Sequence, residues 1–342
     1  MFKKKALLFS IILFVFLSAC SSTSSTDVNN ANNEKDSKAV ETSTKNSDDS
    51  IVSAPDAHLQ KLDKGEQVEL LQQALNKIGY NIGANGTYDE STTWAITDLQ
   101  LQTEELMATG VYDENTKQTI KLFLEESKSL EPGKGLPLVE EATSDVSDAK
   151  VLSNPYDVLA IVNKEFALPE NYEPEDLVTP NVRFPFTEEL PKKQMRQVAA
   201  NALEKMFKAA DKENLELFAQ SGYRSYDRQK AIFASNVEKH GEKEANVFSA
   251  RPGESEHQSG LTMDVTSQEV NFDLIFEFGE TAEGKWIKEH ASEYGFIIRY
   301  PEGKEEITKY QYEPWHLRYV GKKAAKEIMK NNLTLEEYIL EN

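Results

Sequence analysis

Apolar positions divide the chain into segments that can fold and segments that cannot. Periodic apolar residues occupy 58–127 and 153–342, whereas 20–57 and 128–152 lack any such pattern. The first polar segment, rich in Ser, Thr, Asn and Asp, is typical of a disordered tether. The second is an acidic, Ser-rich stretch with Pro132 and Gly133 near its start, and it is interpreted as a linker. The pattern therefore predicts two folded domains joined by a linker.

The smaller domain combines a predicted helix with an internal repeat. The helix is indicated by apolar residues at helical spacing, namely Val68, Leu71, Leu75 and Ile78. After it, Gly-Thr-Tyr-Asp at 86–89 returns 24 residues later as Gly-Val-Tyr-Asp at 110–113. Each copy predicts a glycine turn, a short extended segment and a helix. Asp89 and Asp113 are the expected N-caps, because their side chains can accept the free N–H groups of a first helical turn.

The larger domain mixes helical and strand patterns. Helices are expected over 195–214, 226–239 and 286–294, and strands over 215–219, 261–265, 297–300 and 315–320. Helices gathered around a few antiparallel strands define the α+β class. The predicted architecture is therefore an α+β domain with a small antiparallel sheet, preceded by a small three-helix domain.

The N-terminus has the pattern of a targeting segment. Three lysines at positions 3–5 precede an apolar stretch, 6–16, that only Ser10 interrupts. This stretch is shorter than the roughly 20 residues of a membrane-spanning helix, so a signal peptide over 1–19 is favoured. Cys20 follows Leu-Ser-Ala and is the only cysteine of the chain, which excludes an intrachain disulfide. One interpretation of this segment is an ordinary secretory signal that is followed by an incidental cysteine.

Composition narrows the classes of partner. The 342 residues are 39% hydrophobic, which is enough for real cores in part of the chain. The formal net charge is -20. Nucleic-acid binding needs clustered Lys and Arg against phosphate, so no nucleic-acid partner is predicted. Solubility is the simplest interpretation of the acidic charge.

Two short clusters in the larger domain carry candidate chemistry. The first contains His257 and Asp264, and the second contains Glu313 and His316. Two imidazoles, a carboxylate and a spare carboxylate are the composition of a catalytic zinc site. The spacing alone does not decide, because residues seven apart on a straight strand face opposite sides. Gly260 would allow a turn that brings the first two together.

Each of these residues also has a structural interpretation. A lone histidine is more often a satisfied structural residue than a ligand. Glu313, held extended by Pro314, could form a salt bridge to Arg318. The three other histidines, His58, His240 and His290, lie in the tether edge, a polar loop and a predicted helix, where structural roles suffice.

Longer motifs give a resemblance to known families. The runs are Ser-Gly-Tyr-Arg-Ser-Tyr at 221–226, Ser-Glu-His-Gln-Ser-Gly at 255–260 and Glu-Pro-Trp-His-Leu-Arg-Tyr-Val-Gly at 313–321. Together they resemble the VanY-type D-alanyl-D-alanine carboxypeptidases, zinc peptidases of bacterial cell-wall metabolism. Residues 58–127, with their paired Gly-x-Tyr turns, resemble the three-helix peptidoglycan-binding domain. The alternative for that domain is a helical module without a ligand. Residues 17–20 resemble the lipobox of bacterial lipoproteins, in which the cysteine is acylated.

The resemblance implies roles for individual residues. It implies one zinc ion held by His257, Asp264 and His316, with Glu313 as the general base. Arg224 would face the substrate and stabilise an oxyanion or hold the terminal carboxylate, and Gln229 and Ser255 would contact substrate. By itself, Arg224 would be taken for a surface residue of a Ser-Tyr-rich turn. Trp315 is expected to pack in the core.

The implied function is a D,D-carboxypeptidase that removes the terminal D-alanine from peptidoglycan stem peptides. Its partners would be stem peptides, glycan and, through a lipid on Cys20, the extracytoplasmic face of the cell membrane. Two alternatives stay open. One is an L,D-carboxypeptidase acting on tetrapeptide stems with the same ligands, and the other is a non-catalytic wall-binding lipoprotein.

Overall fold

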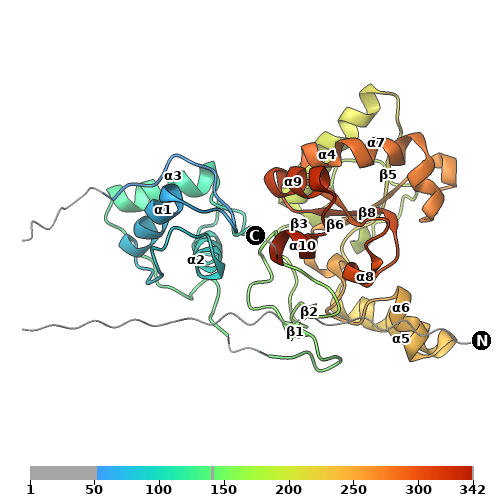
Figure 1. Cartoon of the computed structure of the whole chain (residues 1–342), viewed down its shortest axis with the longest axis horizontal. Coiled ribbons are helices and arrows are strands. Elements are labelled where there is room, and N and C mark those ends of the chain that lie inside the picture. Colours follow the sequence, from blue (N-terminus) through green and yellow to red (C-terminus); the bar gives the residue numbers. More distant parts are fainter. Residues whose placement is uncertain (1–51, 140–141, 341–342) are drawn as a thin grey trace, which may run out of the picture. The chain divides into compact units, whose positions relative to one another are not determined.

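The structure is a computed structural model that describes residues 52–139 and 142–340 (Figure 1). The predicted signal peptide and Cys20 lie outside the described residues. Within the described part of the chain, no helix combines the length and the apolar character needed to cross a membrane.

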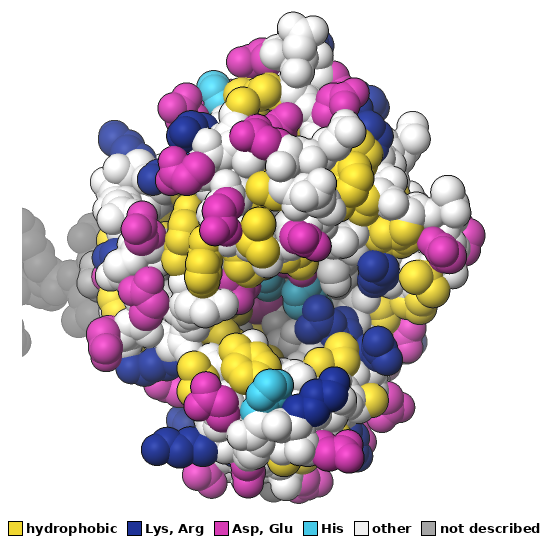
Figure 2. Space-filling view, turned by 90° about the vertical axis from the view of Figure 1, so that its right-hand side faces the viewer, with side chains coloured by type: hydrophobic (Ala, Val, Ile, Leu, Met, Phe, Trp, Pro, Cys, Tyr) yellow, Lys and Arg dark blue, Asp and Glu magenta, His cyan; other side chains and the backbone are white. Residues whose placement is uncertain are grey.

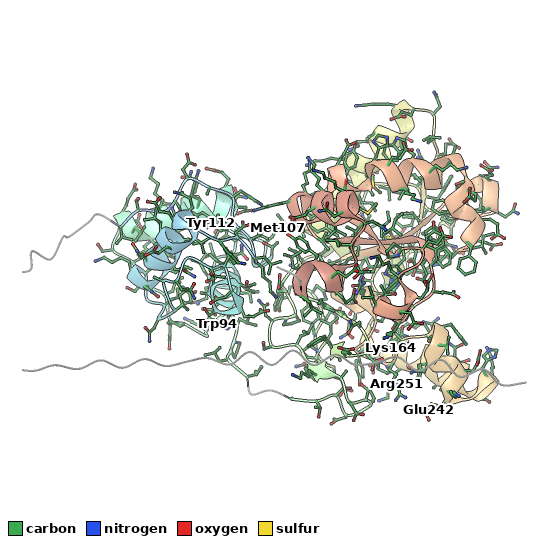
Figure 3. All side chains as sticks on the ribbon, viewed as in Figure 1. Trp94, Met107, Tyr112, Lys164, Glu242 and Arg251 are labelled. Atoms are coloured by element: carbon green, nitrogen blue, oxygen red, sulfur yellow. The ribbon has the colours of Figure 1, made fainter. Side chains whose placement is uncertain are left out.

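The smaller domain contains three helices around one core. The helices are α1 (Glu66–Lys77), α2 (Glu90–Leu101) and α3 (Glu114–Glu125). The tyrosines of the two repeat copies, Tyr88 and Tyr112, are fully buried in this core, and Figure 3 labels the second of them. Asp89 and Asp113 accept hydrogen bonds from the third residue of the helix that follows each of them, which confirms the two expected N-caps. The repeat therefore corresponds to two turn-and-helix units.

The first part of the predicted linker is bound to α2. The fully buried Asp98 accepts hydrogen bonds from the backbone N–H groups of Gly135 at 2.8 Å and Leu136 at 2.7 Å. Trp94, also on α2, donates its indole N–H to the carbonyl of Leu136 at 3.1 Å. Residues 133–136 thus have fixed partners although their sequence shows no periodic apolar pattern.

The larger domain is built around a four-stranded antiparallel sheet. Its order is β5 (Phe218–Ser221), β6 (Thr262–Thr266), β8 (Glu313–Tyr319) and β7 (Phe296–Tyr300). Two short two-stranded pairs precede it, formed by β1 (Lys150–Val151) with β2 (Phe166–Ala167) and by β3 (Leu177–Val178) with β4 (Met195–Arg196). The helices are α4 (Gln197–Lys212), α5 (Tyr226–His240), α6 (Glu242–Phe248), α7 (Ala282–His290), α8 (Glu305–Thr308), α9 (Lys322–Asn331) and α10 (Leu335–Leu340). Mixed helices and a small sheet match the predicted α+β class.

One face of the sheet holds the core of this domain. Met263, Val265 and Leu317 are fully buried there, packed in one cluster with apolar residues of α4, α7 and α9. Figure 1 shows these three helices together, with α5 and α6 lying apart from them.

An ion pair at 3.0 Å between Arg251 and Glu242, both labelled in Figure 3, fixes the start of α6 to the loop that follows it.

Most element boundaries differ from the sequence prediction by a few residues, and three of these differences have a local cause. The helix expected from 195 begins at Gln197, because Met195 and Arg196 pair with β3. The strand expected over 215–219 lies at 218–221, because Asn214 takes a left-handed conformation at the end of α4 and the chain needs three residues to reach the sheet. The helix expected from 286 begins at Ala282, because the Thr281 hydroxyl caps it.

Candidate active site

Neighbouring strands bring three of the candidate site residues together. Asp264 on β6 is directly opposite His316 on β8. Opposite residues of an antiparallel pair project to the same face, so their side chains meet. Glu313 begins β8, three residues before His316, and would face the other side of a regular strand. The pairing of β7 with β8 is irregular between Ile298 and Tyr300, and this irregularity lets Glu313 reach the same site.

His257 reaches the site from a turn. It lies in a 3-10 turn, Glu256–Ser259, directly before β6. Gly260 ends this turn with a φ of 68°, a left-handed conformation that glycine adopts without strain. The spacing of seven residues between His257 and Asp264 is therefore compatible with one site, because the chain turns between them.

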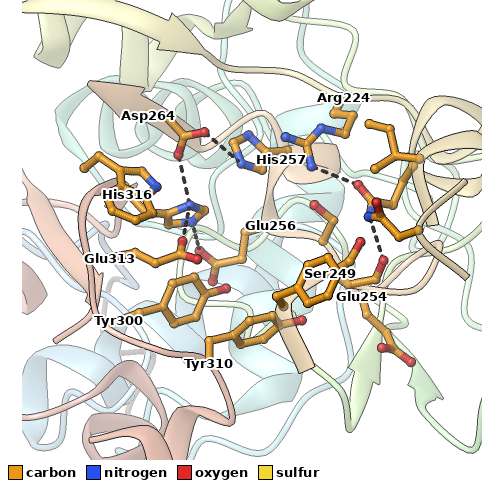
Figure 4. Close-up of a pocket in the computed structure, with 17 residues that line it drawn as sticks. Arg224, Ser249, Glu254, Glu256, His257, Asp264, Tyr300, Tyr310, Glu313 and His316 are labelled. Carbon is orange, nitrogen blue, oxygen red and sulfur yellow. Dashed lines mark hydrogen bonds and ion pairs between the residues drawn. The ribbon is translucent and has the colours of Figure 1, made fainter. Parts of the chain in front are cut away.

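Ligand atoms of His257, Asp264 and His316 all lie within 4.8 Å of one another, and all three side chains are buried. Nε2 of His257 lies 3.4 Å from one oxygen of Asp264, and Nδ1 of His316 lies 3.1 Å from the other. Figure 4 shows Asp264 between the two rings. The carboxylate is therefore placed to share a cation with both imidazoles.

The electrostatics of this cluster fit a bound cation. Burial, together with the charge of Arg224, lowers the pKa of His257 to about 3, so this ring is a neutral donor. Burial opposes protonation of His316 as well, but its contacts with Asp264 and Glu256 outweigh burial and raise its pKa to about 9. Asp264 Oδ1 is buried and, although it lies 3.1 Å from Nδ1 of His316, it makes no well-aligned hydrogen bond with any described residue. His316 would release its proton on binding a cation, and two nitrogen donors with one oxygen donor then suit zinc.

Glu313 is the spare carboxylate of the cluster. Its Oε2 lies 3.6 Å from Nδ1 of His316. Burial raises the pKa of Glu313 to about 7, an effect that the charge of His316 opposes and that of Asp264 reinforces. A carboxyl group with a pKa near neutral can both take up and release a proton in this pH range.

Arg224 faces the same centre from the segment before α5. Its Nη1 donates a hydrogen bond to Oε1 of Gln229 at 2.9 Å, and its backbone N–H donates to the carbonyl of His257 at 3.2 Å. Gln229, on α5, is itself held by donating to the carbonyl of Ala250 at 2.6 Å. Gln229 thus orients the guanidinium, and the substrate contact that the resemblance implied for Gln229 stays a prediction.

The cluster lies in a cavity of about 240 Å³. Arg224, Gln229, Ser255 and Trp315 line it together with the three candidate ligands and Glu313. Figure 2 shows a hollow on this face, with histidine and basic side chains inside it and hydrophobic side chains around its rim. All the site residues predicted in the larger domain therefore lie at one opening of the molecular surface.

Two contributors were missed at the sequence level. Glu256 is fully enclosed and pairs with Arg318 at 2.6 Å, so the arginine considered as a partner of Glu313 has a different one. Tyr300, on β7, packs its ring 4.8 Å from that of His316. The only local signal for Glu256 was its position directly before His257. The sequence around Tyr300 held no such signal.

Two other histidines, His240 and His290, make contacts outside the cluster of candidate metal ligands. His290 pairs with Glu293 at 3.0 Å and packs against Trp286. His240 packs its ring against Phe248 at the end of α6. These contacts agree with the structural roles expected for both.

Two buried imidazoles and a carboxylate, with a second carboxylate alongside, are the kind of side chains that hold the metal in many metal-dependent hydrolases. Comparison with known families agrees. Residues 192–322 match the family VanY: D-alanyl-D-alanine carboxypeptidase, and residues 64–120 match the family "Putative peptidoglycan binding domain". The chain belongs to the VanY D-alanyl-D-alanine carboxypeptidase family and carries an N-terminal peptidoglycan-binding domain.

The chain aligns with most of the length of each of three relatives. The chain is 54% identical over 226 residues to "Putative carboxypeptidase YodJ" of Bacillus subtilis, covering 65% of this chain and 83% of that protein. It is 36% identical over 189 residues to the bifunctional D-Ala-D-Ala dipeptidase and D-Ala-D-Ala carboxypeptidase VanXYC of Enterococcus gallinarum, covering 53% and 92%. The solved structure of the LdcB LD-carboxypeptidase superposes with a TM-score of 0.56 at 57% identity, covering 58% of this chain and 92% of that one.

Proposed function

We propose that the larger domain is a zinc-dependent carboxypeptidase that trims peptidoglycan stem peptides. The observation that carries the proposal is the meeting of His257, Asp264 and His316 within 4.8 Å, with Glu313 beside them in a cavity open to solvent. Zinc, when bound, polarises a carbonyl and lowers the pKa of water to about 7, which makes a nucleophile available at neutral pH.

The side chains of the site supply the rest of the chemistry. Glu313 takes the proton from the attacking water and passes it to the leaving amine. Its pKa of about 7 suits it for both steps. Arg224, held by Gln229, offers a fixed positive charge to an oxyanion or to the terminal carboxylate of the substrate.

The proposal is tested with Glu313→Gln. The amide keeps the shape of the side chain but cannot take up a proton from water. The rate at which the terminal residue is hydrolysed from the stem peptide should therefore fall by about 10²–10⁴-fold. Zinc content, measured by mass spectrometry of the purified protein, should remain one ion per chain. Undiminished release of the terminal residue by this variant would contradict the mechanism, and wild-type protein without zinc would favour the non-catalytic alternative.

Specificity has two candidates, each with a supporting relative. The D,D-carboxypeptidase expected from the motifs has support from VanXYC, at 36% identity. The L,D alternative has support from LdcB, at 57% identity. The higher identity favours cleavage of tetrapeptide stems. Mass spectrometry of the products from matched pentapeptide and tetrapeptide stems separates the two: a loss of D-alanine from the tetrapeptide alone means L,D specificity.

The N-terminal part of the chain supports a location at the cell wall and the membrane. A peptidoglycan-binding domain would keep the enzyme near the polymer and raise the local concentration of its substrate. Acylation of Cys20 would hold the enzyme at the extracytoplasmic face of the cell membrane. Cys20→Ala should release the protein from the membrane fraction into the soluble fraction, and unchanged membrane association would reject the lipid anchor.

A further inference from the structure

A buried carboxylate next to the cluster has no part in the proposed mechanism. Glu256 is 1% exposed and directly precedes His257. Its Oε1 accepts hydrogen bonds from Nε of Arg299 at 2.7 Å and from Nη1 of Arg318 at 2.6 Å. Both arginines are fully buried, and both place their positive charge against this one oxygen. The group is therefore a carboxylate with one oxygen fixed in place.

The other oxygen of Glu256 faces His316. Its Oε2 lies 3.5 Å from Nε2 of His316. Among the described residues, neither of these two buried atoms has a hydrogen-bond partner. One is an acceptor and the other can donate, so each is the partner available to the other. On the opposite side of the same ring, Nδ1 points at Asp264.

We propose that Glu256 is the positioning residue of His316. By accepting the Nε2 proton, it turns the lone pair of Nδ1 toward the centre shared with His257 and Asp264. The inference rests on the proposed function, because it assigns the nitrogen through which His316 would hold the metal. A ligating histidine commonly donates its second ring N–H to a carboxylate or carbonyl, which fixes its tautomer and orientation.

The other candidate histidine ligand is held in a corresponding way. Nδ1 of His257 lies 2.7 Å from the carbonyl oxygen of Gly222, so Nε2 is left to face Asp264. Each ring is thus oriented through the nitrogen that points away from the centre. His257 is oriented through Nδ1 and His316 through Nε2. The group that orients His257 is a backbone carbonyl, whereas the group that orients His316 is a carboxylate.

The carboxylate is anchored at long range. Arg299 donates to both oxygens of Glu336 on α10, at 2.9 and 2.6 Å, and Asn163 donates to Glu336 at 3.1 Å. Helix α10 thereby fixes the arginine that fixes Glu256. A purely structural alternative exists, in which Glu256 only neutralises two buried arginines. The experiment must separate that role from positioning.

The test is Glu256→Gln in the full-length protein. Glutamine keeps the size of the side chain and can still accept from an arginine, but it can present an N–H group to Nε2 of His316. Zinc affinity, measured by competition with a chromophoric chelator, should fall by about 10–100-fold. The visible spectrum of the cobalt-substituted protein should also change. Affinity and spectrum equal to wild type in the folded variant would overturn the proposal.

Asp176→Asn is the matched control. It removes the carboxylate that pairs at 2.9 Å with another buried arginine, Arg196, which is 1% exposed. A structural loss of this kind should lower the unfolding midpoint and leave zinc affinity and the cobalt spectrum unchanged. Equal losses of zinc affinity in the two variants would also overturn positioning by Glu256.

A measurement on the wild-type protein covers the case in which Glu256→Gln does not fold. Nitrogen-15 NMR of the zinc-loaded protein should show Nε2 of His316 carrying a proton and Nδ1 bound to metal. Metal on Nε2 would overturn the assignment while leaving the zinc enzyme intact. Wild-type protein that binds no zinc would overturn both the assignment and the proposed function.

Discussion

At the scale of single residues, the site depends on charges that its surroundings hold in place. Arg224 is a case in which shape matters as much as charge, because its guanidinium donates to Gln229 and can still present further N–H groups to the cavity. Lysine would keep the charge but lose the planar fork that makes two parallel hydrogen bonds to an oxyanion or carboxylate.

Arg224→Lys should therefore lower kcat/KM by about 10²-fold, since losing one oxyanion donor costs about that much. Steady-state kinetics on stem peptides measure the effect, and zinc content should not change. Arg228→Lys, an exposed residue in the first turn of α5, is the control and should behave as wild type. Equal kinetics for Arg224→Lys and wild type would remove Arg224 from the site.

Gly260 shows how one residue determines the position of a candidate metal ligand, His257. Its φ is 68°, and a Cβ added there would lie 2.8 Å from Cγ of Arg196 and 3.0 Å from Cδ2 of Leu177. Gly303 has a similar φ of 78°, but a Cβ there would meet nothing within 4 Å. Replacement of either glycine by alanine would therefore strain the backbone to a similar degree. Only at Gly260 would the added Cβ also clash with neighbouring side chains.

Gly260→Ala should destabilise the domain by more than the 1–3 kcal/mol or so expected for the backbone conformation alone, and it should weaken zinc binding by moving His257. Gly303→Ala should show the backbone cost only. Urea unfolding and chelator competition on the two variants provide the comparison. Equal losses of stability would mean that the packing of Arg196 on Gly260 contributes nothing.

At the scale of elements, Asp98 and Asp113 represent two uses of a carboxylate by helices of the smaller domain. Asp113 caps one helix, and its replacement by alanine should cost about 1 kcal/mol. Asp98 is fully buried and binds the backbone of residues 133–136 as well as the hydroxyl of Tyr80.

Asp98→Ala should therefore release part of the linker, because several N–H groups lose their acceptor together. Limited proteolysis should cut within 128–139 faster in Asp98→Ala than in wild type. Asp113→Ala should lower stability without exposing that segment. Identical cleavage patterns in the two variants would show that Asp98 does not hold the linker.

The sequence predicted what depends on local pattern and missed what depends on distant pairing. The strands of His316 and Asp264 lie within two residues of their predicted bounds, because apolar β-branched and aromatic runs are local signals. The irregular pairing that turns Glu313 toward His316 depends on β7 and has no local signal. Glu256 pairs with arginines 43 and 62 residues away, so its environment could not be read from neighbouring residues.

At the scale of the whole molecule, two apolar cores, each built mainly from one domain, predict two unfolding events. One apolar cluster lies among the three helices of the smaller domain, and the other lies between the main sheet and α4, α7 and α9. The candidate metal ligands belong only to the larger domain, which contains β6 and β8. A ligand that binds the folded state stabilises only the unit that holds it.

Zinc removal should therefore shift one calorimetric transition and leave the other in place. At a free zinc concentration 100-fold above Kd, binding contributes about 2.7 kcal/mol. For a domain of this size, that corresponds to a midpoint shift of roughly 5–10 °C. Scanning calorimetry with and without a chelator measures the shift, and added zinc should reverse it. His316→Ala should show the lower midpoint under both conditions, because it lacks a ligand. If both transitions moved together, the two domains would unfold as one unit, and if neither moved, the metal site would be rejected.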